Sequence, residues 1–248
     1  MSNPISPLAT RLVALRRSNA APATADPAQV PADFAAAYSV QAEVLQELGE
    51  QVGGWKVGIA PDGTPFGAPM FASGLLASGT SLPLGPYLVI EMEIGVRLAR
   101  DLAPGEHARE AILDAVDEVI VGLELLRGRL GEPPAAPFNA FLADNGANLG
   151  YVVGAASRSV RSLDLGALPC RLTLDGEVVH EAVGGHPQND PLSPIRTFLA
   201  RWPAAMGGLR AGQVVTTGSL NKPVRLTRPA RVVAQIEGLG RVELVVTG

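Results

Sequence analysis

Residues 63–90 restrict the possible folds of this chain more than any other stretch. They contain no charged side chain and are numerous enough for a helix that crosses a bilayer. Prolines and glycines recur throughout, and a continuous helix does not accommodate them, because proline removes a backbone donor and glycine favours turns. We therefore predict buried turns and short strands here, and no membrane span. These residues are Pro65, Gly67, Pro69, Gly74, Gly79, Pro83, Gly85 and Pro86.

The beginning of the chain predicts two helices. Ser6 followed by Pro7 is a typical N-cap and first-turn pair, and the basic side chain of Arg17 favours a helix C-terminus. A second helix is predicted after Asp33, and Gly49 ends it. The segment between the two helices is small, polar and proline-containing, which favours a loop.

Beyond residue 52 the pattern changes to strands and turns, in keeping with 28 glycines and 21 prolines. We therefore predict an α+β fold, with an N-terminal helical segment at residues 1–52 and one compact β-rich domain at residues 53–248. Two further helices are predicted, at residues 111–119 and from Asp190 to Gly207-Gly208. The predicted strands are residues 88–98, 120–126, 170–174, 177–181, 213–217, 230–236 and 241–246, with a tight turn at Asp175-Gly176.

Charge and missing motifs exclude several classes of function. The formal net charge of −4 predicts no basic surface, so we expect no nucleic-acid partner. The single cysteine, Cys170, excludes a disulfide framework. With no recognisable targeting segment, it favours a cytoplasmic location. The chain has no G-x-S-x-G nucleophile elbow, no P-loop and no H-E-x-x-H zinc motif.

Three acidic residues stand out because of their surroundings. Residues 88–98 alternate strictly, so one face of this strand belongs to the core and the other to a solvated or polar space. Glu91 and Glu93 share the second face and repel each other, and Glu124 interrupts an apolar run. Three converging carboxylates would suit Mg²⁺ or Mn²⁺. The alternative is a solvated sheet face on which the first two acids pair with Arg97.

The chain contains only two lysines, and their contexts differ. Lys56 lies in an apolar, glycine-flanked segment, where a lysine either extends its ammonium to the surface or faces a pocket. Lys222 follows a loop segment that could lie at the mouth of the same site. We therefore expect Lys56, and not Lys222, to act in chemistry.

Several short motifs follow one another in a fixed order along the chain. They are Gly54-Trp55-Lys56-Val57-Gly58, Glu91-Met92-Glu93 with Glu124, Ala143-Asp144-Asn145, Gly185-His186-Pro187, Thr217-Gly218-Ser219 and Ile236-Glu237-Gly238-Leu239-Gly240. By these motifs the chain resembles the fumarylacetoacetate hydrolase superfamily over nearly its whole length, and within it the group of 2-keto-4-pentenoate hydratases and 4-oxalocrotonate decarboxylases. The resemblance implies a mixed β-roll or barrel-like catalytic core preceded by helices.

The resemblance also implies roles for individual residues. Glu91, Glu93 and Glu124 would bind Mg²⁺ or Mn²⁺, and Lys56 would be a substrate-binding or proton-handling catalytic group. His186 is expected to be a structural loop residue. The substrate site would be lined by Asp144 as a second catalytic group and by Asn145, Thr217, Gly218 and Ser219. From the residues alone, Asp144, Thr217 and Ser219 equally fit turns and strand ends.

The implied chemistry uses a small 2-keto acid, which chelates a metal that stabilises the enolate next to its ketone. We expect a hydratase or a decarboxylase, and a homo-oligomer built from dimers. Hydratases of this group usually carry an acidic residue shortly before a Phe-Gly pair. In this chain the pair is Phe66-Gly67, and the acid nearby is Asp62. The alternatives are a C–C bond hydrolase, a 2-keto diacid decarboxylase, and a non-catalytic binding protein or complex partner of a pathway decarboxylase or hydratase.

Overall fold

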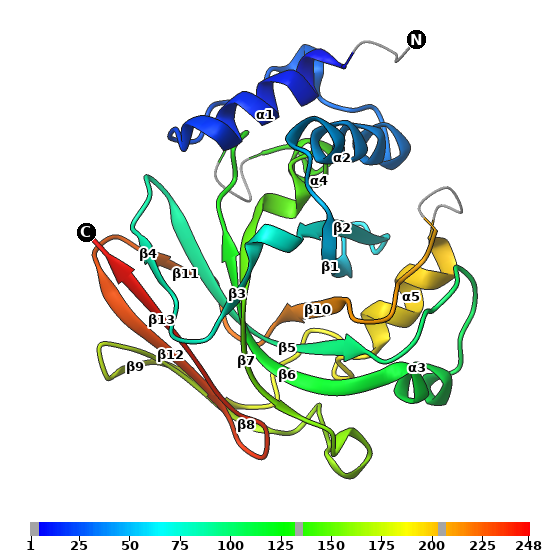
Figure 1. The fold of residues 1–248 in the computed structure, drawn as a ribbon, viewed down its shortest axis with the longest axis vertical. Coiled ribbons are helices and arrows are strands. Elements are labelled where there is room, and N and C mark those ends of the chain that lie inside the picture. Colours follow the sequence, from blue (N-terminus) through cyan, green and yellow to red (C-terminus); the bar gives the residue numbers. More distant parts are fainter. Residues whose placement is uncertain (1–4, 132–135, 203–206) are drawn as a thin grey trace.

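The computed structural model describes residues 5–131, 136–202 and 207–248 and confirms the predicted α+β class. The N-terminal helices lie over one end of a curved sheet, and a second sheet packs on the far side of its long central strands (Figure 1). The helices are α1 (Pro7–Ser18), α2 (Phe34–Leu48), α3 (Arg109–Ala115), α4 (Phe138–Ala143) and α5 (Ser193–Arg201), with short 3₁₀ turns at Pro27–Gln29, Ala72–Gly74, Asn145–Ala147 and Val160–Ser162.

The larger sheet contains β1 (Val52–Ile59), β2 (Pro65–Phe71), β3 (Leu75–Ala77), β5 (Leu88–Leu98), β6 (Val116–Leu126), β7 (Asn148–Ser157), β10 (Val214–Ser219) and β11 (Val224–Leu226). Its strand order is β2-β1-β10-β5-β6-β7-β3, and β11 also pairs with β5. The smaller sheet contains β4 (Ser81–Pro83), β8 (Pro169–Leu174), β9 (Glu177–Val183), β12 (Ala230–Ile236) and β13 (Gly240–Thr247), in the order β4-β13-β12-β8-β9.

The main hydrophobic core lies between the two sheets. The even-numbered side chains of β5, such as Ile90 and Met92, are buried in one cluster with Val232 and Leu244 from the smaller sheet. The odd-numbered side chains of β5 must therefore point to the opposite, concave face, because successive side chains alternate across a strand. This packing places Glu91 and Glu93 away from the apolar core.

The N-terminal helices begin and end as predicted. The side chain of Ser6 accepts a hydrogen bond from Ala9 N at the start of α1, and that of Asp33 accepts one from Ala36 N at the start of α2. Gly49 ends α2 with a positive φ of 66°. The two helices share a second hydrophobic cluster with α4 and with Phe66 of β2. The division of the chain at residue 52 stays a prediction.

Two predicted helices have different bounds in the structure. Helix α3 ends at Ala115, and residues 116–119 begin β6, where Val116 pairs with Leu98 of β5. The prediction for 116–119 was wrong because valines spaced for a helix also satisfy a strand, and pairing with the long β5 decides between them. Helix α5 begins at Ser193, not Asp190, and ends at Arg201, not Gly207-Gly208; residues 203–206 lie outside the described residues.

The remaining predicted strands are present, whereas β7 and β11 were not among the predicted strands. The β8–β9 hairpin turns at Asp175-Gly176, where both residues have positive φ, and β12 and β13 lie where strands were predicted. Residues 63–90 form β2, β3 and β4 with turns between them. No helix among the described residues combines the length and the apolar composition that crossing a bilayer requires.

Helix α5 packs its aromatic side chains on β1 and β2. Trp55 of β1 lies against Trp202, the residue that follows α5, with ring centroids 4.6 Å apart. On β2, Gly67 allows the Phe198 ring to approach, and a Cβ added there would lie 2.2 Å from that ring. A side chain at Gly67 is therefore incompatible with the present position of α5.

We predict that Gly67→Ala lowers the free energy of unfolding by about 1–3 kcal/mol, the usual cost of overpacking a core. Gly74→Ala is the control, because its added Cβ would make only ordinary contacts at 3.4 Å. Urea denaturation of both variants measures the difference. Equal stability of the two variants would contradict the packing of α5 on β2.

Candidate functional site

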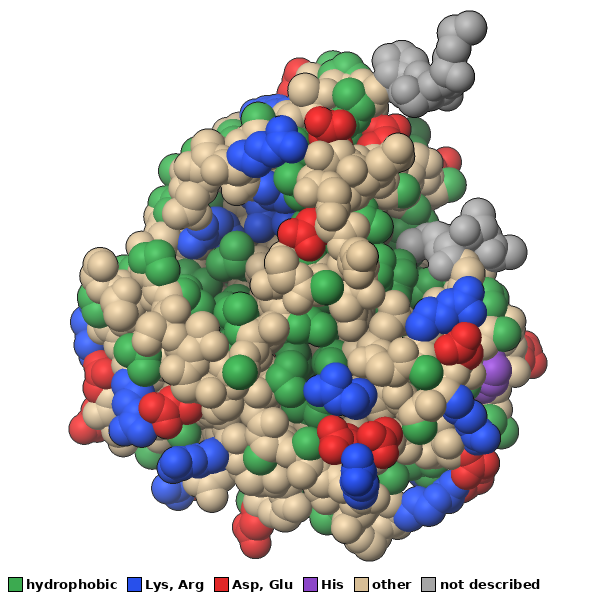
Figure 2. All heavy atoms as spheres, viewed as in Figure 1, with side chains coloured by type: hydrophobic (Ala, Val, Ile, Leu, Met, Phe, Trp, Pro, Cys, Tyr) green, Lys and Arg blue, Asp and Glu red, His purple; other side chains and the backbone are tan. Residues whose placement is uncertain are grey.

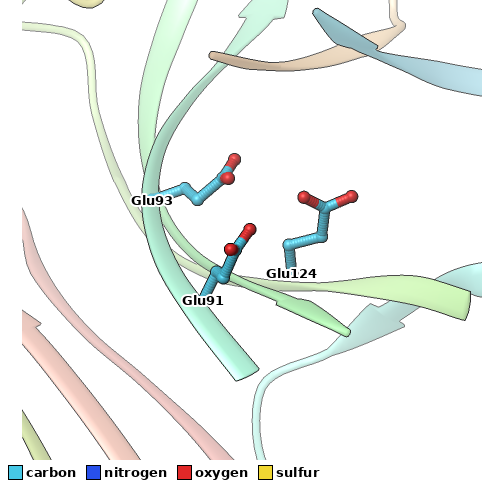
Figure 3. Close-up of side chains that lie close together, drawn as sticks. All are labelled: Glu91, Glu93 and Glu124. Carbon is cyan, nitrogen blue, oxygen red and sulfur yellow. The ribbon is translucent and has the colours of Figure 1, made fainter. Parts of the chain in front are cut away.

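Glu91, Glu93 and Glu124 converge on the concave face of the larger sheet. Strands β5 and β6 are antiparallel, and their register places Glu91 directly opposite Glu124, with Glu93 two residues further along β5. One carboxylate oxygen from each of the three lies within 4.8 Å of the others. Figure 3 shows the three carboxyl groups pointing into the same space. The structure therefore brings together the three carboxylates that the sequence singled out.

This face of β5 is a polar interior, not a solvated surface. Glu93 and Glu124 are 2% and 0% exposed, and Glu91 is half-buried. Arg97 pairs with Glu118 at 3.4 Å, so the predicted alternative, in which it pairs with Glu91 and Glu93, was wrong. Neighbouring strands cover this face because the larger sheet curves around it.

Burial and mutual repulsion dominate the electrostatics of the three acids. Burial raises the pKa of Glu91 to about 7, with Lys56 opposing and Glu124 adding to the shift. Burial and the charges of Glu124 and Glu91 raise the pKa of Glu93 well above its usual range. The backbone N–H of Gly218 opposes this shift through a hydrogen bond to Glu93. The cluster therefore favours a nearby positive charge.

Lys56 supplies a positive charge from the side of β1. Its Nζ lies 2.9 Å from Glu124 Oε2 and 3.2 Å from the carbonyl oxygen of Gly146. Burial alone would lower the pKa of Lys56, but the carboxylates of the cluster outweigh burial and raise it. Of the two lysines, Lys56 is therefore the one at the carboxylates, whereas Lys222 is exposed.

The donor set fits a hard divalent cation. All three candidate ligands are carboxylates, the ligand type that Mg²⁺ and Mn²⁺ prefer. The Oε2 atom of Glu93 is buried and has no hydrogen-bond partner among the residues that the structure describes, which is costly for a carboxylate unless a cation binds it. Glu91, Glu93 and Glu124 are therefore the residues that would hold the metal.

The predicted substrate segment in β10 borders the triad through its backbone. Gly218 has a φ of 130°, which favours glycine, and its N–H contacts Glu93. The hydroxyl of Thr217 donates to the carbonyl of Ile94 at 2.9 Å, and that of Ser219 donates to the carbonyl of Asn221 at 2.7 Å. Both hydroxyls are thus engaged with backbone, and their contact with substrate stays a prediction.

His186 fixes the same segment from below. Its ring Nε2 donates to the carbonyl of Thr217 at 3.0 Å, and its Nδ1 accepts from Gln188 N at 3.2 Å. The side chain is buried, and burial lowers its pKa, which keeps the ring neutral. The geometry agrees with the expected structural role.

Asp144 is held by arginines. Its Oδ1 lies 3.0 Å from Arg129 Nη1 and 3.3 Å from Arg16 Nη2, and its Oδ2 accepts from Arg129 N at 2.6 Å. Both carboxylate oxygens therefore have hydrogen-bond or ion-pair partners. Asp144 immediately precedes the loop whose residue Gly146 contacts Lys56. This surrounding favours a positioning role for Asp144, and its catalytic role stays a prediction.

The loop after Asp144 reaches the triad. Asn145, Gly146 and Ala147 all have positive φ values, an unusual run that turns the chain toward Lys56. The side chain of Asn145 donates to the carbonyl of Pro69 at 3.0 Å. Asn148, which the sequence did not single out, donates from Nδ2 to Glu124 Oε1 at 2.8 Å. No signal of this contact is present in the sequence, because Asn148 is the first residue of β7, a strand that was not predicted.

Tyr151 and Thr216 are further residues of this face that sequence reasoning missed. Both are buried, and within the described part of the chain neither hydroxyl makes a hydrogen bond of good geometry. The signal that could have found Tyr151 is a pair of glycines inside long apolar strands, Gly95 and Gly122, because glycine in a strand often marks a close approach by another group.

The molecular surface is hollowed between the N-terminal helices and the sheets. In Figure 2, apolar side chains line much of this hollow, and basic side chains lie beneath the helices at its upper end.

Comparisons with known proteins extend over most of the chain. The family model described as "Fumarylacetoacetate (FAA) hydrolase C-terminal" matches residues 41–247. A 2-keto-4-pentenoate hydratase of Burkholderia vietnamiensis is 29% identical, with 87% of each chain covered. A protein named 2-keto-4-pentenoate hydratase 3, from Pseudomonas putida, is 31% identical, with 83% of this chain and 81% of that protein covered.

Solved structures share the fold. A 4-oxalocrotonate decarboxylase from Pseudomonas putida G7, complexed with magnesium and adipate, aligns with a TM-score of 0.83 at 22% identity, covering 96% of this chain and 95% of that one. A fumarylpyruvate hydrolase from Pseudomonas aeruginosa, in complex with Mn²⁺ and pyruvate, aligns with a TM-score of 0.56 at 17% identity, covering 78% and 88%.

The contacts of the triad predict opposite effects of two neutral substitutions on the metal-free protein. Glu124→Gln removes the charge that pairs with Lys56 and should lower the free energy of unfolding by about 1.5–3 kcal/mol, the usual contribution of a charged hydrogen bond. Glu93→Gln removes the charge of a buried acid that is repelled by its two neighbours, and should leave that free energy at or above the wild-type value. Thermal unfolding in EDTA measures both. The reverse order would show that the repulsion within the triad is not a significant cost.

Proposed function

Because the chain belongs to the fumarylacetoacetate hydrolase family, we propose that it is a divalent-metal-dependent enzyme that acts on a small 2-keto acid, as a hydratase. The family resemblance inferred from the motifs is confirmed by the match over residues 41–247. Hydration is favoured over other outcomes because similar proteins over most of the chain are named hydratases. The proposed metal is Mg²⁺ or Mn²⁺, as in the named complexes of two proteins that share the fold.

One observation carries the proposal: three carboxylates, of which Glu93 and Glu124 are buried and Glu91 is half-buried, meet one partly buried lysine at a single point. A bound divalent cation supplies Lewis-acid stabilisation of the negative charge that develops on the oxygen of a 2-keto acid. An inert structural site would not require the ammonium of Lys56 beside a metal ligand. The same cluster suits a substrate that carries both a carboxylate and a ketone.

The residues around the cluster have separate tasks. Lys56 holds a proton at Nζ, 2.9 Å from Glu124, and is placed to attract the substrate carboxylate and to exchange that proton with the substrate. Gly218 brings its backbone close to Glu93, and we propose that Asn145, Thr217 and Ser219 contribute to the substrate wall beside it. Asp144 holds the loop that carries Gly146 toward Lys56.

Decarboxylation is the second candidate function, and one observation favours it. Asp62, the acid nearest to Phe66-Gly67, is exposed, and its Oδ1 accepts a hydrogen bond from Thr64 N within a turn. It is therefore not placed as the acid that hydratases usually carry in this segment. Loss of CO₂ needs no attacking water, so Lys56 alone could provide the required proton.

Assembly into dimers, or with a pathway decarboxylase or hydratase, stays a prediction.

The test of activity is incubation with Mg²⁺ or Mn²⁺ and a 2-hydroxy-dienoate, following the decay of the conjugated chromophore. A parallel incubation with an unsaturated 2-keto diacid, assayed for released CO₂, distinguishes decarboxylation. Chromophore loss without CO₂ supports the hydratase. Inertness toward both substrates would leave the non-catalytic alternative as the better account.

We predict that Lys56→Met lowers kcat by about 10²-fold or more, the usual contribution of a positioned acid–base group. Lys222→Met is the matched control, because its side chain is exposed, and at most it should raise KM. Steady-state kinetics of both variants measure the difference. An inactive Lys222→Met beside an active Lys56→Met would mean that the catalytic lysine is assigned wrongly.

We also predict that oxalate, a mimic of the enolate of a 2-keto acid, stabilises the protein only when Mg²⁺ or Mn²⁺ is present. A ligand that binds only the folded state raises Tm, and the increase depends on its concentration. Thermal unfolding with oxalate, with and without EDTA, measures the effect. An equal rise in Tm in EDTA would place oxalate on cationic side chains and contradict a metal-dependent substrate site.

A further inference from the structure

We propose that Tyr151 is a positioning residue that, together with Thr216, fixes Glu93 as a metal ligand. Tyr151 belongs to β7, and its backbone pairs with that of Glu124 in the neighbouring strand β6. Its side chain is fully buried. The inference rests on the proposed function, since it concerns the same metal, but it assigns a role to two residues outside the ligand set.

The phenol of Tyr151 extends over two neighbouring strands, where glycines make room for it. A Cβ added at Gly122 of β6 would lie 2.0 Å from the Tyr151 hydroxyl oxygen, and one added at Gly95 of β5 would lie 2.6 Å from it. Gly122 pairs with Glu93, and Gly95 pairs with Thr216. The register therefore brings the hydroxyl between the positions of Glu93 and Thr216.

Among the described residues, three buried oxygen atoms at this place lack a hydrogen bond of good geometry: Glu93 Oε2, the Tyr151 hydroxyl and the Thr216 hydroxyl. A carboxylate oxygen only accepts, whereas each hydroxyl donates one hydrogen bond and accepts others. A chain in which Thr216 donates to Tyr151, and Tyr151 donates to Glu93, would satisfy all three atoms. Small side-chain rotations would suffice, because the three residues lie in adjacent rows of one sheet face.

A phenol keeps its proton at neutral pH and can donate one hydrogen bond. The hydroxyl is also closed off from solvent, so it does not line the entrance to the site. We therefore assign Tyr151 to support of the ligand, not to contact with substrate.

Support of this kind has a measurable consequence. Groups that hydrogen-bond to a metal ligand orient it, and their removal usually costs about 10–100-fold in metal affinity or activity. Glu93 has less support than Glu124, because Lys56 and Asn148 both bond to Glu124, whereas Glu93 is reached by the backbone N–H of Gly218. Without the phenol, the repulsion of the other two acids would be free to turn Glu93 away from its ligand position.

The test is the affinity of the full chain for Mn²⁺ alone, measured by calorimetry or by the electron paramagnetic resonance of free Mn²⁺. We expect Tyr151→Phe to weaken the Kd by about 10-fold or more. Its Tm in EDTA is measured beside the Kd to show that the variant folds, because deleting a buried hydroxyl that bonds to Glu93 affects the stability of the metal-free protein as well. Tyr38→Phe is the matched control: the hydroxyl of this half-buried tyrosine accepts from Gly67 N at 3.3 Å, and its loss should leave the Mn²⁺ Kd unchanged.

A second variant tests the chain of hydroxyls and guards against a folding defect. Thr216→Val should also weaken Mn²⁺ binding, and the double variant with Tyr151→Phe should bind no more weakly than Tyr151→Phe alone, because both changes break one path. Additive losses would overturn the shared path. An apo Tm that falls in Tyr151→Phe, with an unchanged Mn²⁺ Kd, would overturn the inference in favour of a purely structural tyrosine.

The controls separate this inference from the proposed function. If the wild-type chain binds no Mn²⁺, or if Glu124→Gln binds it as well as wild type, the proposed metal site itself is wrong. If wild type binds Mn²⁺, Glu124→Gln does not, and Tyr151→Phe matches wild type, the site stands and only the role of Tyr151 fails.

Discussion

The contact between Lys56 and Glu124 is the interaction on which the rest of the site depends. It joins β1 to β6, two strands that are not neighbours in the sheet, and it does so inside the protein. Without the lysine, the three carboxylates would repel each other, and this repulsion would favour their moving apart. The lysine offsets part of that repulsion while leaving Glu91 and Glu93 without a cation of their own. The arrangement is thus stable enough to fold, yet it retains an excess of negative charge.

A second set of contacts holds the loop that completes the site. Asp144 lies between Arg16 and Arg129 and so links the first helix to the end of β6. The three left-handed residues that follow would be costly in a free chain, and these ion pairs offset that cost. The N-terminal helices therefore contribute to the site from a distance, through Arg16, although none of the three acids belongs to them.

Much of this arrangement could be predicted from the sequence, and the failures have physical causes. The alternation of β5 identified both acids and the face they share, because a period of two leaves no other placement. The cap residues Ser6 and Asp33 fixed the helix starts, because their side chains bond locally. Contacts made across the sheet left no local trace: Asn148 and Tyr151 act on residues more than twenty positions away. The predicted helix before β6 extended to residue 119, whereas α3 ends at Ala115, because the pairing of residues 116–119 with β5 ends the helix there.

The glycines at positions 95 and 122 have a consequence for how this family can vary. Each exists beside a tyrosine ring that occupies the volume of its missing side chain. The three positions are therefore expected to vary together. Replacing the tyrosine by a small residue makes room in the sheet for alanine or serine at both glycine positions. Replacing either glycine first would force the tyrosine ring to move. Aligned relatives should show these three columns changing together.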